Sequence, residues 1–139
     1  MSDAAAIARE GIDAWNRRDW TRARELYHAQ YTYTGSNGEV QKGPDAGLAM
    51  GQMWAAAFPD GKIDIKKIHA VGDTAISEYT GSGTHKGDLM GIAPTGKQIA
   101  IPICNVMEVR DGKIYAERDY MDMAHMMQQL GVMPAAATA

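Results

Sequence analysis

The sequence predicts an α+β domain: three helices, then a sheet of consecutive strands, then a short closing helix. Apolar residues recur at helical spacing up to residue 57, and from residue 62 they alternate with polar residues, as in strands. The turn sequences Gly72-Asp73 and Asp111-Gly112 join strands that follow one another directly, which favours antiparallel pairing. Helices gathered on one side of a sheet give a layered fold. We expect a strongly curved, cone-shaped sheet with the three helices over its concave face.

The three early helices are recognised by their starts. Ser2 or Asp3 can cap the first, whose apolar face covers residues 4–15. Asp19 can cap the second. Pro44 suits the first position of the third, which Phe58-Pro59 ends. These helices are therefore expected at about 4–15, 20–27 and 44–57.

The strands are recognised by alternation and by turns. A short hairpin is expected at 30–34 and 39–41, and longer strands at 62–71, 74–85, 97–109 and 113–122. The alternation slips near Lys66, which indicates a bulge. The closing helix is expected at 123–130, with Gly131 as its C-terminal cap.

The length of 139 residues predicts one domain, taken as 1–133, followed by a loose tail at 134–139. The net charge of −3 and the scattered basic residues give no groove for nucleic acid and no patch for an anionic membrane. Cys104, the single cysteine, excludes an intrachain disulfide and a cysteine-based zinc site. We find no signal peptide and no apolar run long enough to span a membrane. A cytoplasmic protein is expected.

The residues best suited to chemistry gather in the last predicted strand. Alternation places Arg118, Tyr120 and Asp122 on one face, and Glu117 and Asp119 on the other. In a regular strand, either Asp119 or Asp122 can therefore face an interior, but not both. A carboxylate whose pKa is raised by apolar surroundings can act as a base. Asp122 also stands where the cap of the closing helix belongs, and that role would stabilise its ionised form.

Other side chains could assist such a base. Arg118 could hold an enolate or a substrate carboxylate, or form an ion pair with a neighbouring acid, and Tyr120 could donate to an oxyanion or simply pack. His85, at the end of a long strand, could orient a carbonyl or pair with an aspartate. Binding residues are expected among large apolar or aromatic side chains and one mid-strand amide: Trp15, Tyr33, Met50, Met53, Trp54, Tyr79, Met90 and Asn105. We predict no metal site.

Six short stretches follow one another along nearly the whole chain: Asn16-Arg17-Arg18-Asp19-Trp20, Phe58-Pro59-Asp60, Gly83-Thr84-His85-Lys86-Gly87, Gly91-Ile92-Ala93-Pro94-Thr95-Gly96-Lys97, Asp111-Gly112-Lys113-Ile114, and Tyr120-Met121-Asp122 with Gln129-Leu130-Gly131. Their order, and the order of the elements, resembles the SnoaL-like polyketide cyclases, a branch of the nuclear-transport-factor-2-like superfamily.

The resemblance implies a function as well as a fold. Such cyclases close the last ring of aromatic polyketides by an intramolecular aldol condensation, without a metal or an organic cofactor, and an aspartate near the end of the last strand acts as the base. By position Asp122 matches that aspartate best, and Asp119 second. The resemblance also implies a homodimer formed through the outer face of the sheet. The stretch 27–31 lacks the acidic residue that many relatives carry before the first strand, which disfavours chemistry that needs a base there.

The leading hypothesis is thus a cofactor-free cyclase or isomerase that removes a proton next to a carbonyl of a hydrophobic polyketide-like or other small cyclic substrate. Two alternatives remain open: a non-catalytic protein that binds a small hydrophobic ligand, and an epoxide hydrolase of the same superfamily, in which an aspartate–arginine pair activates water. A carboxylate that faces the cavity with a raised pKa would favour catalysis. An interaction domain is a third reading.

Overall fold

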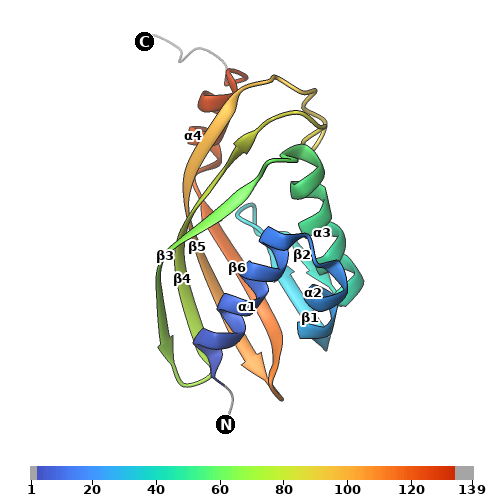
Figure 1. The fold of residues 1–139 in the computed structure, drawn as a ribbon, viewed down its shortest axis with the longest axis vertical. Coiled ribbons are helices and arrows are strands. Elements are labelled where there is room, and N and C mark those ends of the chain that lie inside the picture. The colour runs from blue at the N-terminus through green and yellow to red at the C-terminus, as the bar shows by residue number, and fades with distance from the viewer. Residues whose placement is uncertain (1–2, 134–139) are drawn as a thin grey trace.

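The computed structural model describes residues 3–133, so Ser2 and the tail predicted at 134–139 lie outside the described residues. Figure 1 shows the chain as a tall curved sheet flanked by helices. In chain order the elements are α1 (Ala4–Arg17), α2 (Trp20–Leu26), β1 (Tyr27–Thr34), β2 (Val40–Lys42), α3 (Pro44–Ala57), β3 (Lys62–Val71), β4 (Thr74–Thr84), β5 (Gln98–Arg110), β6 (Lys113–Met121) and α4 (Met123–Leu130). This order confirms the predicted α+β class.

Three helices begin where the sequence supplies an aspartate cap. The side chains of Asp3, Asp19 and Asp122 accept hydrogen bonds from backbone N–H groups in the first turns of α1, α2 and α4. α3 instead begins with Pro44 at its first position and has no side-chain cap. Gly131 ends α4 in the left-handed conformation, with φ of 73°. Local signals therefore set most helix boundaries.

The six strands form one mixed sheet in the order β2-β1-β6-β5-β4-β3. The four long strands pair antiparallel as predicted, and the register of β3 against β4 shifts between Ile65 and Lys67, where the alternation slips. The antiparallel prediction is wrong for one pair, because β1 runs parallel to β6. The physical reason is that β1 pairs not with the next long strand but with the last one. That pairing brings residues 27–34 and 113–121 side by side.

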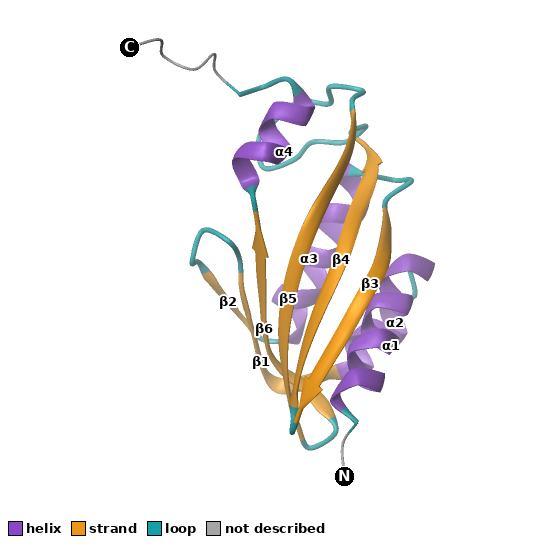
Figure 2. Ribbon diagram, turned by 90° about the vertical axis from the view of Figure 1, so that its left-hand side faces the viewer, coloured by secondary structure: helices purple, strands orange, loops and turns teal. Residues whose placement is uncertain are grey.

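α1, α2 and α3 lie together on one side of the sheet, and α4 packs near one end of β5 (Figures 1 and 2). α1 contacts β3, β4 and β5, whereas α3 contacts β1 and β2. Buried apolar residues form two clusters, one around Tyr31 and Met107 and the other around Phe58 and Leu130. Helices and sheet thus enclose an interior.

Arg18 fixes the turn between α1 and α2, where it adopts the left-handed conformation with φ of 58°. Its guanidinium lies 4.2 Å from the ring centre of Trp15 and donates to the backbone oxygen of Gly61 at 2.9 Å. The Trp15 indole N–H donates to the Gly51 oxygen of α3 at 2.9 Å. These bonds hold α1, α3 and the start of β3 in one arrangement.

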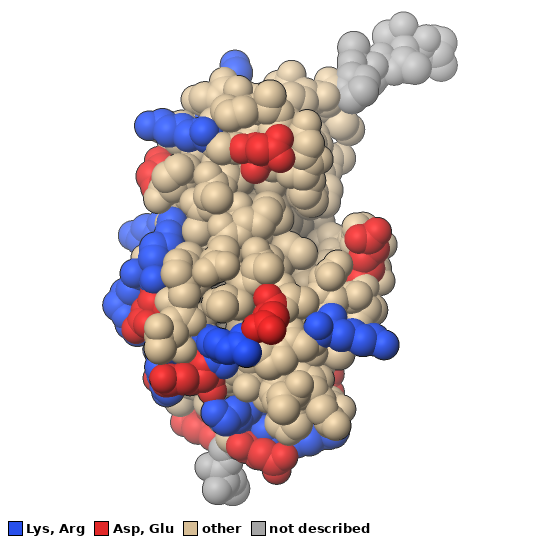
Figure 3. All heavy atoms as spheres, turned by 90° about the vertical axis from the view of Figure 1, so that its right-hand side faces the viewer, with Lys and Arg blue, Asp and Glu red and all other residues tan. Residues whose placement is uncertain are grey.

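Acidic and basic residues are interspersed on the face drawn in Figure 3. No helix among residues 3–133 is long and apolar enough to cross a membrane.

Candidate active site

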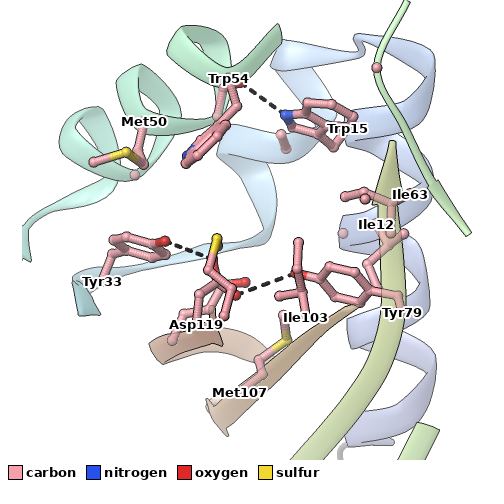
Figure 4. Close-up of a pocket in the computed structure, with 18 of the residues that line it drawn as sticks. Ile12, Trp15, Tyr33, Met50, Trp54, Ile63, Tyr79, Ile103, Met107 and Asp119 are labelled. Atoms are coloured by element: carbon pink, nitrogen blue, oxygen red, sulfur yellow. Dashed lines mark hydrogen bonds between the residues drawn. The ribbon is translucent and has the colours of Figure 1, made fainter. Parts of the chain in front are cut away.

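A cavity of about 180 Å³ lies between the helices and the sheet. Aromatic rings, methionines and branched aliphatic side chains make up most of its wall (Figure 4). The apolar lining comes from both layers and includes Ile12, Trp15, Leu26, Met50, Trp54, Phe58, Ile63, Ile101, Ile103, Met107 and Met121. Such a wall suits a small, flat, hydrophobic molecule.

Two carboxylates, Glu117 and Asp119, interrupt this apolar wall, and both come from β6. They are two residues apart and therefore share one face of the strand. The pairing of β6 with its neighbours brings polar partners to that face. Asn105 on β5 stands opposite Asp119, and Tyr33 on β1 stands opposite Glu117. We refer to Glu117 and Asp119 together as the carboxylate pair.

Asp119 accepts three hydrogen bonds. The Tyr33 hydroxyl donates to its Oδ2 atom at 2.6 Å, and the Tyr79 hydroxyl donates to its Oδ1 atom at 3.3 Å (Figure 4). The Asn105 Nδ2 group also donates to Oδ1, at 2.8 Å. These donors come from three different strands, so the sheet itself orients the carboxylate.

Glu117 accepts two hydrogen bonds. The Tyr31 hydroxyl donates to its Oε1 atom at 2.6 Å, and Asn105 Nδ2 donates to its Oε2 atom at 3.0 Å. Tyr31 and Asn105 are both buried, with 1% and 3% of their surfaces exposed. The pair and its donors form one hydrogen-bonded network.

The surroundings shift the pKa of both carboxyl groups upward. Burial raises the pKa of Asp119, although its hydrogen bonds with Tyr33, Asn105 and Tyr79 oppose this. Burial, and next the negative charge of Asp119, raises the pKa of Glu117 from 4.5 to about 7. Both shifts favour the protonated forms at a pH where ordinary carboxyl groups are ionised.

The tyrosines of the network remain neutral donors. Burial, followed by the nearby carboxylates, raises the pKa of Tyr31, Tyr33 and Tyr79 above the ordinary value of a phenol. A neutral phenol can donate to an oxygen on which negative charge develops. The cavity thus combines two carboxyl groups with several hydrogen-bond donors in an apolar setting.

The other face of β6 carries the remaining predicted catalytic residues of the last strand. Arg118 forms an ion pair with Glu108 of β5, in which Arg118 Nη1 lies 2.6 Å from Glu108 Oε2. Tyr120 is 54% exposed. Asp122 is exposed and accepts from the His125 backbone N–H at 3.0 Å, as a cap. None of these three lines the cavity: Arg118 and Tyr120 lie on the opposite face of β6 from Asp119, and Asp122 follows the end of the strand and caps α4.

His85 and two of the predicted methionines also lie away from the cavity wall. The buried His85 ring accepts the Thr95 backbone N–H at Nδ1, at 3.1 Å, and so braces the connection between β4 and β5. Met90, in that connection, is 57% exposed. Met53 packs against the cluster around Phe58. The structure does not bring these residues to the carboxylate pair.

The predicted binding residues that do line the cavity are Trp15, Tyr33, Met50, Trp54 and Tyr79. Asn105 of β5 donates to both members of the carboxylate pair. This agrees with the rule that a buried amide needs hydrogen-bond partners. Sequence reasoning did not select Glu117 or Tyr31 as site residues. The two-residue period of a strand could have identified them, because Glu117 shares a face with Asp119, and Tyr31 shares a face with Tyr33.

Comparison with known proteins adds family information to this geometry. The chain matches the family model of SnoaL-like polyketide cyclases over residues 5–130. It is 25% identical to aklanonic acid methyl ester cyclase AcmA of Streptomyces galilaeus over 134 residues, which are 94% of this chain and 92% of the relative. It is 26% identical to the corresponding cyclase DnrD of Streptomyces peucetius over 135 residues, with coverage of 94% and 92%.

The fold is similar to that of solved structures. IdmH of Streptomyces antibioticus superposes with a TM-score of 0.81 at 26% identity, and the match covers 94% of this chain and 99% of IdmH. Fold and sequence comparisons therefore lead to the same family.

Proposed function

The chain belongs to the SnoaL-like polyketide cyclase family, and from this premise we propose that it closes a ring in a small hydrophobic carbonyl compound by intramolecular aldol chemistry. No metal or organic cofactor takes part in the proposed reaction. The observation that carries the proposal is Asp119, an oriented carboxylate with a raised pKa that lines an apolar cavity.

Asp119 is the proposed base. Its three hydrogen bonds stabilise the ionised form, while burial raises its pKa toward the range in which a carboxylate can take a proton from an activated carbon. The neutral hydroxyls of Tyr33 and Tyr79 stand beside it. Once Asp119 has taken a proton, these donors can turn to the enolate oxygen of the substrate.

The walls are suited to a flat ring. Trp15 and Trp54 offer aromatic surfaces. The flexible side chain of Met50, on α3, can adapt to a substrate of irregular outline. The volume of about 180 Å³ is close to that of a cavity that holds one aromatic ring, about 150 Å³. We therefore propose that the reacting ring enters the cavity and that the remainder of a larger substrate lies at its mouth.

The first test uses the compounds named for the relatives, aklanonic acid methyl ester and nogalonic acid methyl ester, and follows the cyclised product by chromatography. Asp119→Asn should lower the rate by at least about a hundredfold, because an amide cannot act as the base. Asp122→Asn is the matched control and should keep the rate, since an asparagine also caps a helix. Full activity of Asp119→Asn, or its loss in Asp122→Asn alone, would contradict the assignment.

A ligand-binding protein without turnover is the second candidate, since the apolar cavity alone supports it. Tryptophan fluorescence from Trp15 and Trp54 would then report binding while no product forms. An epoxide hydrolase is less well supported, because Arg118 pairs with Glu108 on the opposite face of β6 from Asp119. No arginine is among the described residues that line the cavity.

We also propose a homodimer formed through the outer face of the sheet. Ile76 and Tyr120 are exposed on that face at 37% and 54% and would lie in such a contact. Light scattering after size-exclusion chromatography should give twice the mass of the chain. Tyr120→Lys should shift the protein toward the monomer without reaching the cavity.

A further inference from the structure

Glu117 lines the same cavity as Asp119, yet the mechanism above leaves it unused. We propose that Glu117 is the general acid of this site: it carries a proton while Asp119 is ionised and gives that proton to the substrate oxygen on which charge develops. This inference rests on the proposed function, because it assigns a second role in the same reaction.

The hydrogen bonds determine which member of the carboxylate pair holds the proton. Asp119 accepts from three donors, whereas Glu117 accepts from two. Each donated bond favours the charged form of the group that accepts it. One nitrogen, Asn105 Nδ2, lies 3.0 Å from an oxygen of Glu117 and 2.8 Å from an oxygen of Asp119, so two full charges would lie close together in an apolar cavity. The pair therefore keeps one proton, and Glu117 is the better place for it.

Tyr31 allows Glu117 to change its protonation state without losing a partner. The Tyr31 hydroxyl donates to Glu117 Oε1 at 2.6 Å, and the Tyr31 ring lies against the Tyr27 ring, with ring centres 4.2 Å apart. It can donate to an ionised Glu117. It can equally accept from a protonated Glu117, since a phenol is both donor and acceptor. A buried group that must gain and lose a proton needs such an adaptable neighbour.

The remaining groups around Glu117 leave this assignment undisturbed. The residues of α1, α2 and α3 that line the cavity are uncharged. The facing groups from the sheet are Tyr27, Tyr31 and Tyr33 of β1, Tyr79 of β4, Asn105 of β5 and Asp119 of β6. Lys62 is the single basic residue among the described lining residues. Lys62 pairs with Ser82, near the end of β4. Asn105 pairs with Ser77, near the start of β4, so Lys62 and Asn105 lie toward opposite ends of that strand.

The proposed step balances within the pair. Asp119 takes the proton from the carbon next to a carbonyl, and the electron pair of that C–H bond forms the new C–C bond to the acceptor carbonyl carbon. The π electrons of the acceptor carbonyl move to its oxygen, and the proton of Glu117 goes to that oxygen. Asp119 ends protonated and Glu117 ends ionised. A proton passed from Asp119 to Glu117 through water restores the starting state.

The first test needs no substrate. Carbon-detected NMR should follow the side-chain carboxyl groups of the full chain from pH 4 to 9 in the wild type, Glu117→Gln and Glu108→Gln. We expect a carboxyl signal that titrates near pH 7, is absent from Glu117→Gln and is unchanged in Glu108→Gln, a matched substitution on the outer face. A Glu117 carboxyl that titrates at its ordinary value would overturn the proposal, whatever the activity.

The second test uses aklanonic acid methyl ester and nogalonic acid methyl ester as probes. The reaction needs ionised Asp119 and protonated Glu117, so the wild-type rate should rise with pH through the pKa of Asp119 and fall above about pH 7. Glu117→Gln should lose tenfold or more in rate and should lack the fall at high pH. An active wild type with an unchanged profile in Glu117→Gln would overturn the role of Glu117 alone. A wild type that converts neither probe would overturn the proposed function, and with it the role of Glu117 in turnover.

Discussion

The Asn105 side chain donates from one nitrogen to both members of the carboxylate pair, at 3.0 Å to Glu117 Oε2 and 2.8 Å to Asp119 Oδ1. Asn105 is only 3% exposed, so water cannot replace it. A single amide thus sets the spacing of the two acidic groups. It comes from β5, which pairs with β6 in antiparallel register.

Asn105→Leu keeps the approximate volume of the side chain but removes both donated bonds. Two buried acceptors then lose a partner, and we expect the free energy of unfolding to fall by about 1–3 kcal/mol. Urea unfolding at pH 8, where both carboxyl groups tend to ionise, would measure this loss. The loss should be smaller in a Glu117→Gln background, because fewer charged acceptors remain. An equal loss in both backgrounds would contradict the shared role.

Tyr33→Phe removes the 2.6 Å bond to Asp119. That bond favours the ionised form, so its loss should raise the pKa of Asp119 further, and the acidic limb of the pH–rate profile should move to higher pH. Tyr79→Phe should cause a smaller shift in the same direction, because its bond is 3.3 Å long. An acidic limb that stays in place in Tyr33→Phe would contradict Asp119 as the base.

Glu117 should make the protein less stable as the pH rises. Its pKa is about 7 in the folded chain, against an ordinary value of 4.5, so the folded state binds more protons between these limits. The stabilisation from the protonated group is complete below pH 4.5 and is lost as the pH passes 7. The contribution of Glu117 to the free energy of unfolding should therefore be roughly 3 kcal/mol larger at low pH than at high pH.

Glu117→Gln lacks this titration. Its unfolding free energy relative to the wild type should therefore increase between pH 4.5 and pH 8, as measured by denaturant unfolding at several pH values. Glu108→Gln, which changes an ion pair on the outer face, serves as the control. A constant difference between Glu117→Gln and the wild type over this pH range would mean that Glu117 titrates normally.

Gly47 lets α3 approach Tyr31 closely. A Cβ atom at residue 47 would clash with Tyr31 Cε2, and Tyr31 is 1% exposed. Gly47→Ala should therefore destabilise the protein by about 1–3 kcal/mol and displace the Tyr31 hydroxyl from Glu117.

Gly11→Ala provides the matched helical control for Gly47→Ala. Its added Cβ would lie 3.5 Å from Ile114 Cδ1, an ordinary contact, so the higher helix propensity of alanine should stabilise the protein by up to about 1 kcal/mol. Thermal unfolding of both variants measures the contrast. Equal stabilisation of the two would show that Tyr31 can move aside.

The sequence by itself determined the local structure. Asp3, Asp19 and Asp122 mark helix starts because a short acidic side chain satisfies free N–H groups of the first turn. The two-residue period also assigns Glu117 and Asp119 to one face of the strand, whichever strands pair with it. It assigns Arg118, Tyr120 and Asp122 to the other face. These features depend on neighbours within a few residues.

Only the tertiary structure decided which face of β6 borders the cavity and which tyrosines meet it. Tyr31 and Tyr33 reach Glu117 and Asp119 across 86 positions of sequence, because β1 lies parallel to β6. No local pattern encodes that pairing, since the choice of partner depends on how the helices and the whole sheet bury their apolar faces together. The sequence therefore supplied two candidate aspartates and marked Asp122 as a helix cap, and packing placed Asp119 in the cavity.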